Sequence, residues 1–408
     1  MPVITIFSGT FCKEQAVVAE LLNKTGYRLI TDKEIIVKAS DLSGMAQDKL
    51  GRAFSAKTSV FNKFTYEKER SIAHVRLALA EILSKNDLLI VGFSGQLIPK
   101  EISHVLRVCL IADMSLRKAV VCEEQGLSEK EALKLIHKED EDRAAWVNTL
   151  FKKTDPWDST LYDIFIPMNK MSVEEAVALV KDNLRKDILK ATNQSKKAVE
   201  DFSLAAKVEV ALAKEGHNIE VNAKDGVLTL SINKHVLMLS RLEEELKSIA
   251  SQVAGVERVE TKVGAGYYQT DIYRKYDFEV PSKLLLVDDE REFVQTLSER
   301  LFMRDIGSAV AYDGRSALQL VKEDEPEVMI LDLKMPGIDG IEVLRRVKES
   351  NPDIEVIILT GHGSEADREV CMKLGAFAYL QKPVDIDVLS ETLRKANEKI
   401  QQKKKVRN

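Results

Sequence analysis

The sequence predicts a multidomain α/β protein whose two larger parts are built on parallel sheets. Its 408 residues suggest roughly two to four domains. Short apolar runs alternate with helical stretches near both ends of the chain, which is typical of parallel α/β layers. In the C-terminal part, several of these runs end at an acidic, hydroxyl or basic residue. Because chemistry in open parallel sheets collects at the carboxyl ends of the strands, these residues should converge on one site.

Composition disfavours several classes of protein. The net charge of −5 argues against a general nucleic-acid binder, and no helix-turn-helix pattern is visible, so we expect no nucleic-acid partner. The four cysteines (Cys12, Cys109, Cys122 and Cys371) form no Cys-x-x-Cys pair, which disfavours a disulfide framework or a zinc site. The N-terminus lacks a signal-peptide pattern, and no apolar stretch has the length of a membrane span. We therefore expect a cytoplasmic protein without a membrane span.

The first block, residues 1–185, alternates strands with helices. Strand patterns occur at 3–7, 87–92, 105–112 and 162–167. The loop that follows the first strand has the position of a phosphate-binding loop. Such a loop needs glycines so that backbone N–H groups can wrap an anion. Gly9 is present, but Glu14 and Gln15 stand where Gly and Lys are required.

This block resembles the cytidylate-kinase-like family over nearly all of its length. The segments that carry the resemblance are 26–36, 87–92, 105–117, 127–132, 140–146 and 162–166. It implies a P-loop-kinase-like parallel α/β domain in which Arg117 and Arg143 would neutralise a transferring phosphate. Gly9 and Lys13 are further candidates for binding an anion. The alternative role for the two arginines is ordinary salt bridging on helices.

Two functions remain open for this block. A nucleotide kinase needs a glycine-rich cradle, and this chain also has Phe93 where the family usually has arginine after Gly92. A catalytically degenerate descendant would instead serve as a ligand sensor or a protein-docking module. The altered loop favours the degenerate module over an active enzyme for this block.

The middle of the chain is smaller and less specific. Residues 186–201 are polar and lysine-rich, as in an exposed helix or linker. Residues 202–263 follow the order helix, hairpin, helix, strand, with the hairpin turn at Asp225-Gly226. This α+β pattern resembles a BON domain, a family associated with lipid or protein binding, and we expect a protein-interaction role here. The aromatic linker 264–280 contains four tyrosines and is expected to pack on a neighbouring domain.

The last block carries the most informative residues. Asp288 and Asp289 end one apolar run, Asp332 ends the next, Thr360 ends a third, and Lys382 follows a fourth. Three carboxylates, a hydroxyl and an ammonium group would therefore meet at one edge of a sheet. That combination suits a divalent cation and a phosphoryl group.

Together these motifs resemble the receiver domain of response regulators over residues 281–404, followed by a tail at 405–408. The resemblance implies a flavodoxin-like (βα)5 fold and a phosphoacceptor at Asp332. The phosphoryl donor would be a sensor histidine kinase or a phosphotransfer protein. Asp288, Asp289 and Asp332 would bind Mg²⁺ together with the backbone carbonyl of Lys334.

The resemblance also assigns roles to the residues around the phosphoryl group. Lys382 and Thr360 would contact phosphoryl oxygens, and Pro383 would follow Lys382 through a cis peptide bond. Tyr379 would be an aromatic switch, with plain surface packing as the alternative.

The whole chain is thus predicted to be a two-component response regulator with a non-DNA-binding output and an unknown downstream protein. A homodimer through the receiver is a further expected partner, because receivers often associate through the face from Tyr379 to Leu389. The alternative is a phosphorylation-regulated nucleoside monophosphate kinase.

Overall fold

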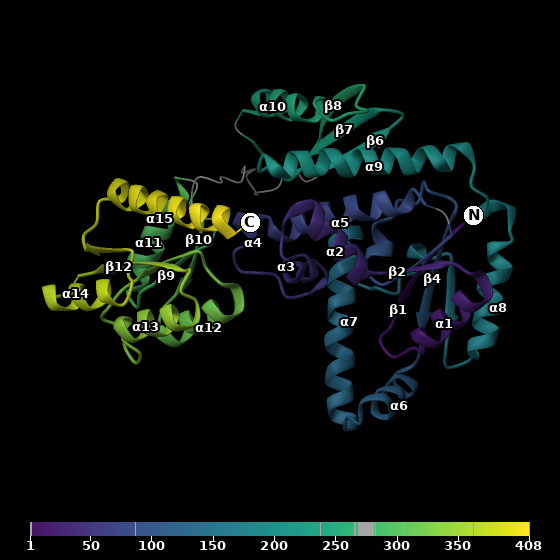
Figure 1. Ribbon diagram of the computed structural model, residues 1–408, viewed down its shortest axis with the longest axis horizontal. Helices are drawn as coiled ribbons and strands as arrows, with labels where there is room; N and C mark the ends of the chain where they lie inside the picture. The colour runs from purple at the N-terminus through teal and green to yellow at the C-terminus, as the bar shows by residue number, and fades with distance from the viewer. Residues whose placement is uncertain are drawn as a thin grey trace. The chain divides into compact units, whose positions relative to one another are not determined.

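The computed structural model describes the chain except for residues 1, 86, 237, 265–266, 268–280, 282, 305, 362 and 408. It folds as two compact units (Figure 1). The first comprises Met1–Thr58 and Glu67–Arg274, and the second comprises Ser59–Tyr66 and Lys275–Asn408. Within the described residues, no helix combines the length and the apolar character that crossing a membrane requires.

The first unit is built around a five-stranded parallel sheet of order β2-β3-β1-β4-β5. Its strands are β1 (Val3–Ser8), β2 (Arg28–Thr31), β3 (Leu88–Val91), β4 (Val105–Ile111) and β5 (Ile164–Pro167). The parallel α/β fold expected for this block is confirmed. The sequence pattern identified four of these strands; β2 is the additional one, at an edge of the sheet.

Helices cover both faces of this sheet, so its strands are apolar on both sides. Val3 and Phe7 of β1 pack in one core with α2, α5 and α7, while Ile4 and Ile6 pack in another with α1 and α8. The helices up to α8 are α1 (Glu14–Thr25), α2 (Asp32–Ser43), α3 (Gln47–Gly51), α5 (Glu67–Leu83), α6 (Met114–Gln125), α7 (Glu129–Phe151) and α8 (Val173–Leu184). Short 3-10 turns are η1 (Arg52–Phe54), η2 (Ser94–Leu97), η3 (Ser159–Leu161) and η4 (Asp187–Leu189).

The rest of the first unit has the expected order of elements: α9 (Asn193–Lys214), β6 (Glu220–Lys224), β7 (Val227–Ile232), α10 (Leu239–Ser251) and β8 (Arg258–Val263). β6 and β7 form an antiparallel hairpin, and β8 pairs parallel to β7. Asp225 and Gly226 both have positive φ (54° and 77°), as a two-residue type I′ turn requires.

The polar stretch before this block is largely helical. α9 begins at Asn193 because the Thr192 hydroxyl accepts a hydrogen bond from the Ser195 N–H at 3.1 Å, and it continues through position 201 without a break. Of the aromatic linker 264–280, only Gly264 and Tyr267 are described. Tyr267 packs in the core of the preceding block; the prediction for the other aromatic residues of this linker lies outside the described residues.

The second unit is a five-stranded parallel sheet of order β10-β9-β11-β12-β13, the flavodoxin-like arrangement expected for the last block. Its strands are β9 (Leu284–Val287), β10 (Ser308–Ala311), β11 (Val328–Leu331), β12 (Glu355–Thr360) and β13 (Ala378–Gln381). Its helices are α4 (Asn62–Thr65), α11 (Arg291–Phe302), α12 (Gly314–Asp324), α13 (Gly340–Ser350), α14 (Glu365–Lys373) and α15 (Ile386–Arg407). α12 and α13 share one core, and α11 and α15 share the core on the other face.

Candidate functional site

Three carboxylates meet at the carboxyl edge of the second sheet. Asp288 and Asp289 follow β9, and Asp332 follows β11, which pairs directly with β9. Ligand oxygens of the three residues lie within 4.8 Å of one another, and the side chains of Asp288 and Asp332 are buried. Carboxylate oxygens at this separation fit Mg²⁺, a hard cation that prefers oxygen ligands. The structure thus brings together the three residues singled out from the sequence.

Lys382 reaches this cluster from the end of β13. Its ammonium nitrogen lies 2.7 Å from Asp288 Oδ2, 2.9 Å from Glu290 Oε1 and 3.9 Å from Asp332 Oδ1. The same nitrogen lies 4.3 Å from the centre of the Phe293 ring. The peptide bond from Lys382 to Pro383 is cis, as the resemblance implied.

The pKa values of the two buried partners reflect this crowding. Burial raises the pKa of Asp288 above its ordinary value, even though the hydrogen bond from Lys382 acts in the opposite direction. Burial alone would lower the pKa of Lys382, but hydrogen bonds to Asp288 and Glu290 raise it above its ordinary value. Lys382 is therefore firmly protonated and supplies a positive charge within the acidic cluster.

Backbone hydrogen bonds hold the loop that follows Asp332. Asp332 Oδ2 accepts a hydrogen bond from the Lys334 N–H at 2.9 Å, and the Gly340 N–H donates to Leu333 O at 3.0 Å. A Cβ at Gly340 would lie 2.1 Å from the Asp332 carbonyl oxygen, so only glycine fits there. The Lys334 carbonyl stays a predicted metal ligand.

Thr360 and Tyr379 lie on neighbouring strands beside the cluster. Thr360 ends β12 and is fully buried. The Tyr379 hydroxyl is buried and has no hydrogen-bond partner among the described residues. A Cβ at Gly363 would lie 1.7 Å from this hydroxyl oxygen and 2.9 Å from Thr360 Cγ2. Tyr379 therefore turns its hydroxyl inward against the loop that follows Thr360.

Three residues around the site were not identified from the sequence. Glu290 continues the acidic pair, and its position directly after Asp289 was a usable signal. Gly363 follows the Thr-Gly pair and leaves the space that the Tyr379 hydroxyl occupies. Phe293 contacts Lys382 across the sheet edge, and no local sequence pattern marks such a long-range contact.

The candidate anion-binding arginines of the first unit are engaged inside the protein. Arg117 pairs with both carboxylate oxygens of Asp140 at 2.7 and 2.8 Å, and its Nε donates to Thr10 O at 2.7 Å. Arg143 donates to Ser8 O at 2.7 Å and to Glu139. Arg143 thus binds the carbonyl at the end of β1, and Arg117 binds a carbonyl of the loop that follows it.

The other two candidates, Gly9 and Lys13, have different surroundings. Gly9 is beside Arg117, where a Cβ would lie 3.6 Å from the guanidinium carbon. Lys13 lines a shallow polar pocket with Asp113, Asn169 and Lys170.

Acidic side chains of the chain itself lie where an anion would be expected. Glu14 hydrogen-bonds Ser8, and burial raises the pKa of Glu14 above its ordinary value. Asp32 accepts from the Phe93 N–H at 2.8 Å and from the Ser94 N–H at 2.9 Å. A second negative group such as a phosphate would be repelled by these carboxylates.

Aromatic rings pack at the same end of the first sheet. Phe93, which follows β3, stacks on Phe54 with 5.3 Å between the ring centres, and it meets Phe7 edge-on with 5.8 Å between the ring centres. The ring centres of Trp146 and Phe54 are 4.9 Å apart, and the indole N–H of Trp146 donates a hydrogen bond to Phe93 O at 3.0 Å. Arg143 lies over the Phe93 ring at 5.4 Å. Phe93, at the position where the resemblance implies an arginine, is thus part of an aromatic cluster.

Comparison with known proteins finds one family match in the C-terminal part of the chain and another in the N-terminal part. Residues 284–394 match the response regulator receiver domain, and residues 3–170 match the cytidylate kinase-like family. A receiver domain therefore occupies the C-terminal part of the chain, and a cytidylate kinase-like segment occupies the N-terminal part.

The chain is similar to a curated response regulator and to a curated transcriptional regulatory protein. It is 34% identical over 115 residues to the response regulator MprA of Mycolicibacterium vanbaalenii (28% of this chain, 50% of that protein). It is 42% identical over 102 residues to the transcriptional regulatory protein CpxR of Escherichia coli (25% of this chain, 43% of that protein). A solved receiver domain from Clostridium thermocellum is 36% identical, with 30% of this chain and 98% of that one covered and a TM-score of 0.28. The chain spans half or less of the length of these two regulators.

Proposed function

We propose that this protein accepts a phosphoryl group on Asp332 from a sensor histidine kinase or a phosphotransfer protein, and that this event controls a binding surface elsewhere in the chain. The observation that carries the proposal is the meeting of Asp288, Asp289 and Asp332 within 4.8 Å beside the ammonium group of Lys382. A cytoplasmic location belongs to the same proposal, because the expected phosphoryl donors act there.

The chemistry follows from the charges at this edge. A carboxylate oxygen of Asp332 would attack the phosphorus of phosphohistidine, forming a P–O bond as the P–N bond to the imidazole breaks. Repulsion between the carboxylates and the phosphoryl oxygens opposes this step. Mg²⁺ held by Asp288, Asp289, Asp332 and the Lys334 carbonyl would supply the neutralising charge.

Lys382 and Thr360 would then hold the phosphoryl oxygens. Lys382 lies 3.9 Å from Asp332, so a small movement away from Glu290 brings its ammonium group to a phosphoryl oxygen. Thr360 would donate its hydroxyl to another oxygen. Movement of Thr360 would change the space that the Tyr379 ring occupies, which makes the pair a two-state element of the kind that phosphorylation biases.

Labelling with acetyl phosphate tests the phosphoacceptor. The full chain should gain one phosphoryl group in Mg²⁺, detectable by intact mass, and should gain none after chelation with EDTA. Asp332→Asn should abolish labelling. Asp313→Asn is the matched control, because Asp313 caps α12 in the same unit and asparagine caps helices equally well. Equal labelling of wild type and Asp332→Asn would refute the assignment.

For the first unit we propose binding without nucleotide kinase activity. The support is the internal pairing of Arg117 with Asp140, the position of Glu14 beside Ser8, and the aromatic packing around Phe93. The output would therefore act on a ligand or an unknown downstream protein and would not read DNA. For residues 202–263, a BON-like protein-interaction role remains an expectation, and so does a receiver homodimer through the face that includes the exposed Val388.

A phosphorylation-regulated nucleoside monophosphate kinase is the second candidate, favoured by the match of residues 3–170 to the cytidylate kinase-like family. The full chain, with and without acetyl phosphate, should be mixed with ATP and CMP and assayed for ADP. We expect no CMP-dependent ADP. CMP-dependent ADP formation at about 1 per second, a common rate for enzymes, would establish the kinase instead.

A further inference from the structure

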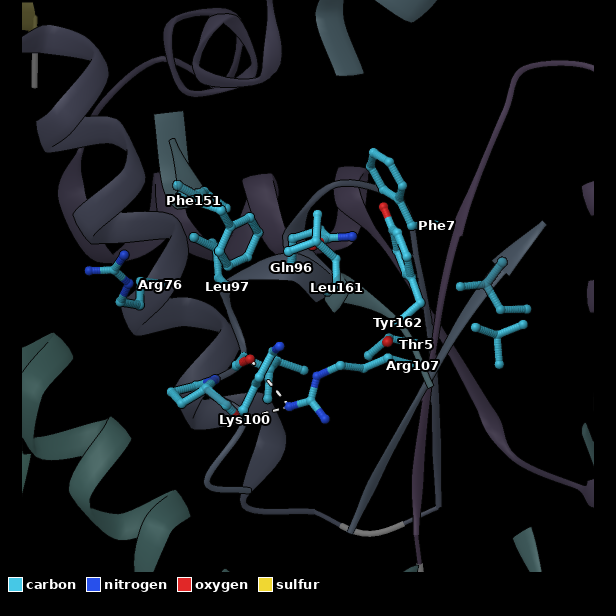
Figure 2. A pocket seen from close by; sticks show the side chains of 17 residues that line it. Thr5, Phe7, Arg76, Gln96, Leu97, Lys100, Arg107, Phe151, Leu161 and Tyr162 are labelled. Atoms are coloured by element: carbon cyan, nitrogen blue, oxygen red, sulfur yellow. Dashed lines mark hydrogen bonds between the residues drawn. The ribbon is translucent and has the colours of Figure 1, made fainter. Parts of the chain in front are cut away.

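A small pocket lies in the first unit. It has a volume of about 160 Å³ and lies over the middle of β1 and β4, beside η2 and the end of α7 (Figure 2). Thr5 and Arg107, which are register partners on these two strands, both line it. An engineered apolar cavity of about 150 Å³ holds benzene, so this pocket has the size of a single ring.

The lining contains both apolar and polar residues. Leu97, Phe151 and Leu161 are apolar, and Figure 2 shows the Gln96 side chain among them. The charged residues of the lining are Arg76, Lys100 and Arg107, and all three are cations. Arg76 is already paired with Glu209. The charge that remains for a ligand is therefore that of Lys100 and Arg107.

Arg107 is the less exposed of the two arginines in this set, with a side chain that is 13% exposed against 26% for Arg76. Figure 2 shows it extending across one end of the pocket towards Lys100. Its guanidinium donates to the carbonyl oxygens of Pro99 at 2.7 Å and Val105 at 3.2 Å. The carboxylate paired with it, Asp163, is 48% exposed and lies 4.0 Å away. Neutral carbonyls and two carboxylates, the half-exposed Asp163 and the exposed Glu101, leave part of the Arg107 charge available to an anion.

A buried cation of this kind favours an anion that can approach it closely. Burial lowers the pKa of Arg107 below its ordinary value, which reflects the same desolvation. The planar guanidinium matches a carboxylate in shape and charge. Lys100 donates to Thr160 O at 2.6 Å, and its ammonium group has two further N–H donors.

We propose that this pocket binds a small carboxylate with one apolar ring or a branched aliphatic body. The carboxylate would lie at Arg107 and Lys100, and the apolar body would pack against Leu97, Phe151 and Leu161. This site is separate from the acidic cluster around Asp332 and needs no phosphorylation. It would make the first unit a sensor of a small molecule.

Calorimetric titration of the full chain with sodium benzoate tests the proposal. Benzyl alcohol and benzylamine have the same ring with no charge and with the opposite charge. We expect benzoate to bind at least about tenfold more tightly than benzyl alcohol, and benzylamine not to bind. Failure of benzoate to bind at about 10 mM, or equal binding of all three probes, would overturn the proposal.

Variants locate the binding. Arg107→Gln should weaken benzoate binding at least about tenfold, and Leu161→Trp should abolish it by filling the pocket. Arg185→Gln, at a guanidinium that is 76% exposed, is the matched control and should bind benzoate normally. Thermal unfolding checks that each variant is folded. If Arg107→Gln does not fold, Lys100→Gln and Leu161→Trp decide, and normal benzoate binding by both would overturn the pocket assignment.

Discussion

If Asp332 is phosphorylated as proposed, Glu290 would compete with the phosphoryl group for Lys382. Its carboxylate lies 2.9 Å from the ammonium nitrogen and is 66% exposed, so water screens the pair and a small displacement separates it. Asp288, in contrast, is buried and holds the same nitrogen at 2.7 Å. In the proposed phosphorylation, Lys382 would therefore exchange its exposed partner, Glu290, for a phosphoryl oxygen and keep its buried partner, Asp288.

Glu290→Gln should speed phosphorylation by acetyl phosphate about two- to fivefold. The substitution removes one negative charge near the incoming phosphoryl group and frees Lys382 from an exposed partner. The rate of labelling at fixed acetyl phosphate and Mg²⁺ measures the effect. Glu292→Gln, in the exposed first turn of α11, removes the same charge nearby and should change the rate less. A slower Glu290→Gln protein would contradict this role.

The cysteines give a residue-scale prediction that depends on pH. Burial raises the pKa of Cys12 and of Cys371 to about 11, and a thiol reacts as its thiolate. At pH 8, about one molecule in a thousand carries either thiolate. Cys122, the half-buried cysteine, should therefore react first with a disulfide reagent. Labelling of Cys12 and Cys371 should rise about tenfold per pH unit from 8 to 10, provided that the fold persists. Rapid labelling of all four cysteines at pH 8 would contradict these burial assignments.

At the scale of elements, β12 and β13 create an unusual polar site inside the second unit. The Tyr379 hydroxyl is buried against Gly363 with no partner among the described residues, although its strand pairs regularly with β12. An unpaired buried hydroxyl costs about 1–3 kcal/mol relative to a hydrogen-bonded or solvated one. The inward position of Tyr379 therefore costs free energy of folding, as expected for a side chain that adopts a second position.

Tyr379→Phe should raise the free energy of unfolding of the second unit by about 1 kcal/mol, because it removes the unpaired hydroxyl and keeps the ring. Urea unfolding measures the change. Tyr312→Phe is the matched control, since its ring faces Arg291 at 4.7 Å and belongs to the same unit. Destabilisation by Tyr379→Phe would mean that the hydroxyl makes a hydrogen bond in solution.

Elements that carry their own local signal could be predicted from the sequence. Asp225-Gly226 identified the β6–β7 hairpin, and the apolar runs before Asp288, Asp332, Thr360 and Lys382 identified four strands of the second sheet. Contacts between distant segments could not be predicted, because local periodicity carries no information about them. The pairs of Lys382 with Phe293 and of Arg117 with Asp140 are of this kind.

At the scale of the whole molecule, the second unit is not continuous in sequence. Ser59–Tyr66 belongs to it, although more than two hundred residues of the first unit separate this segment from Lys275. Phe61 is fully buried in the core that contains Leu285, Val287 and Val343, and the Val60 N–H donates to Asp324 at 3.3 Å. A fragment limited to the receiver would therefore lack part of its own core.

Phe61→Ala should destabilise the second unit by about 3–5 kcal/mol, as expected for truncation of a buried aromatic side chain. Val60→Ala is the control, because Val60 is 43% exposed and its truncation should cost less than about 1 kcal/mol.

A fragment and a peptide test the same segment. A fragment of residues 275–408 should lose as much free energy of unfolding as Phe61→Ala does. A peptide of residues 57–67 should restore its stability in proportion to the logarithm of peptide concentration, whereas the Phe61→Ala peptide should not. Full stability of the fragment alone would show that the segment contributes no core, and the receiver would then be independent of residues 59–66.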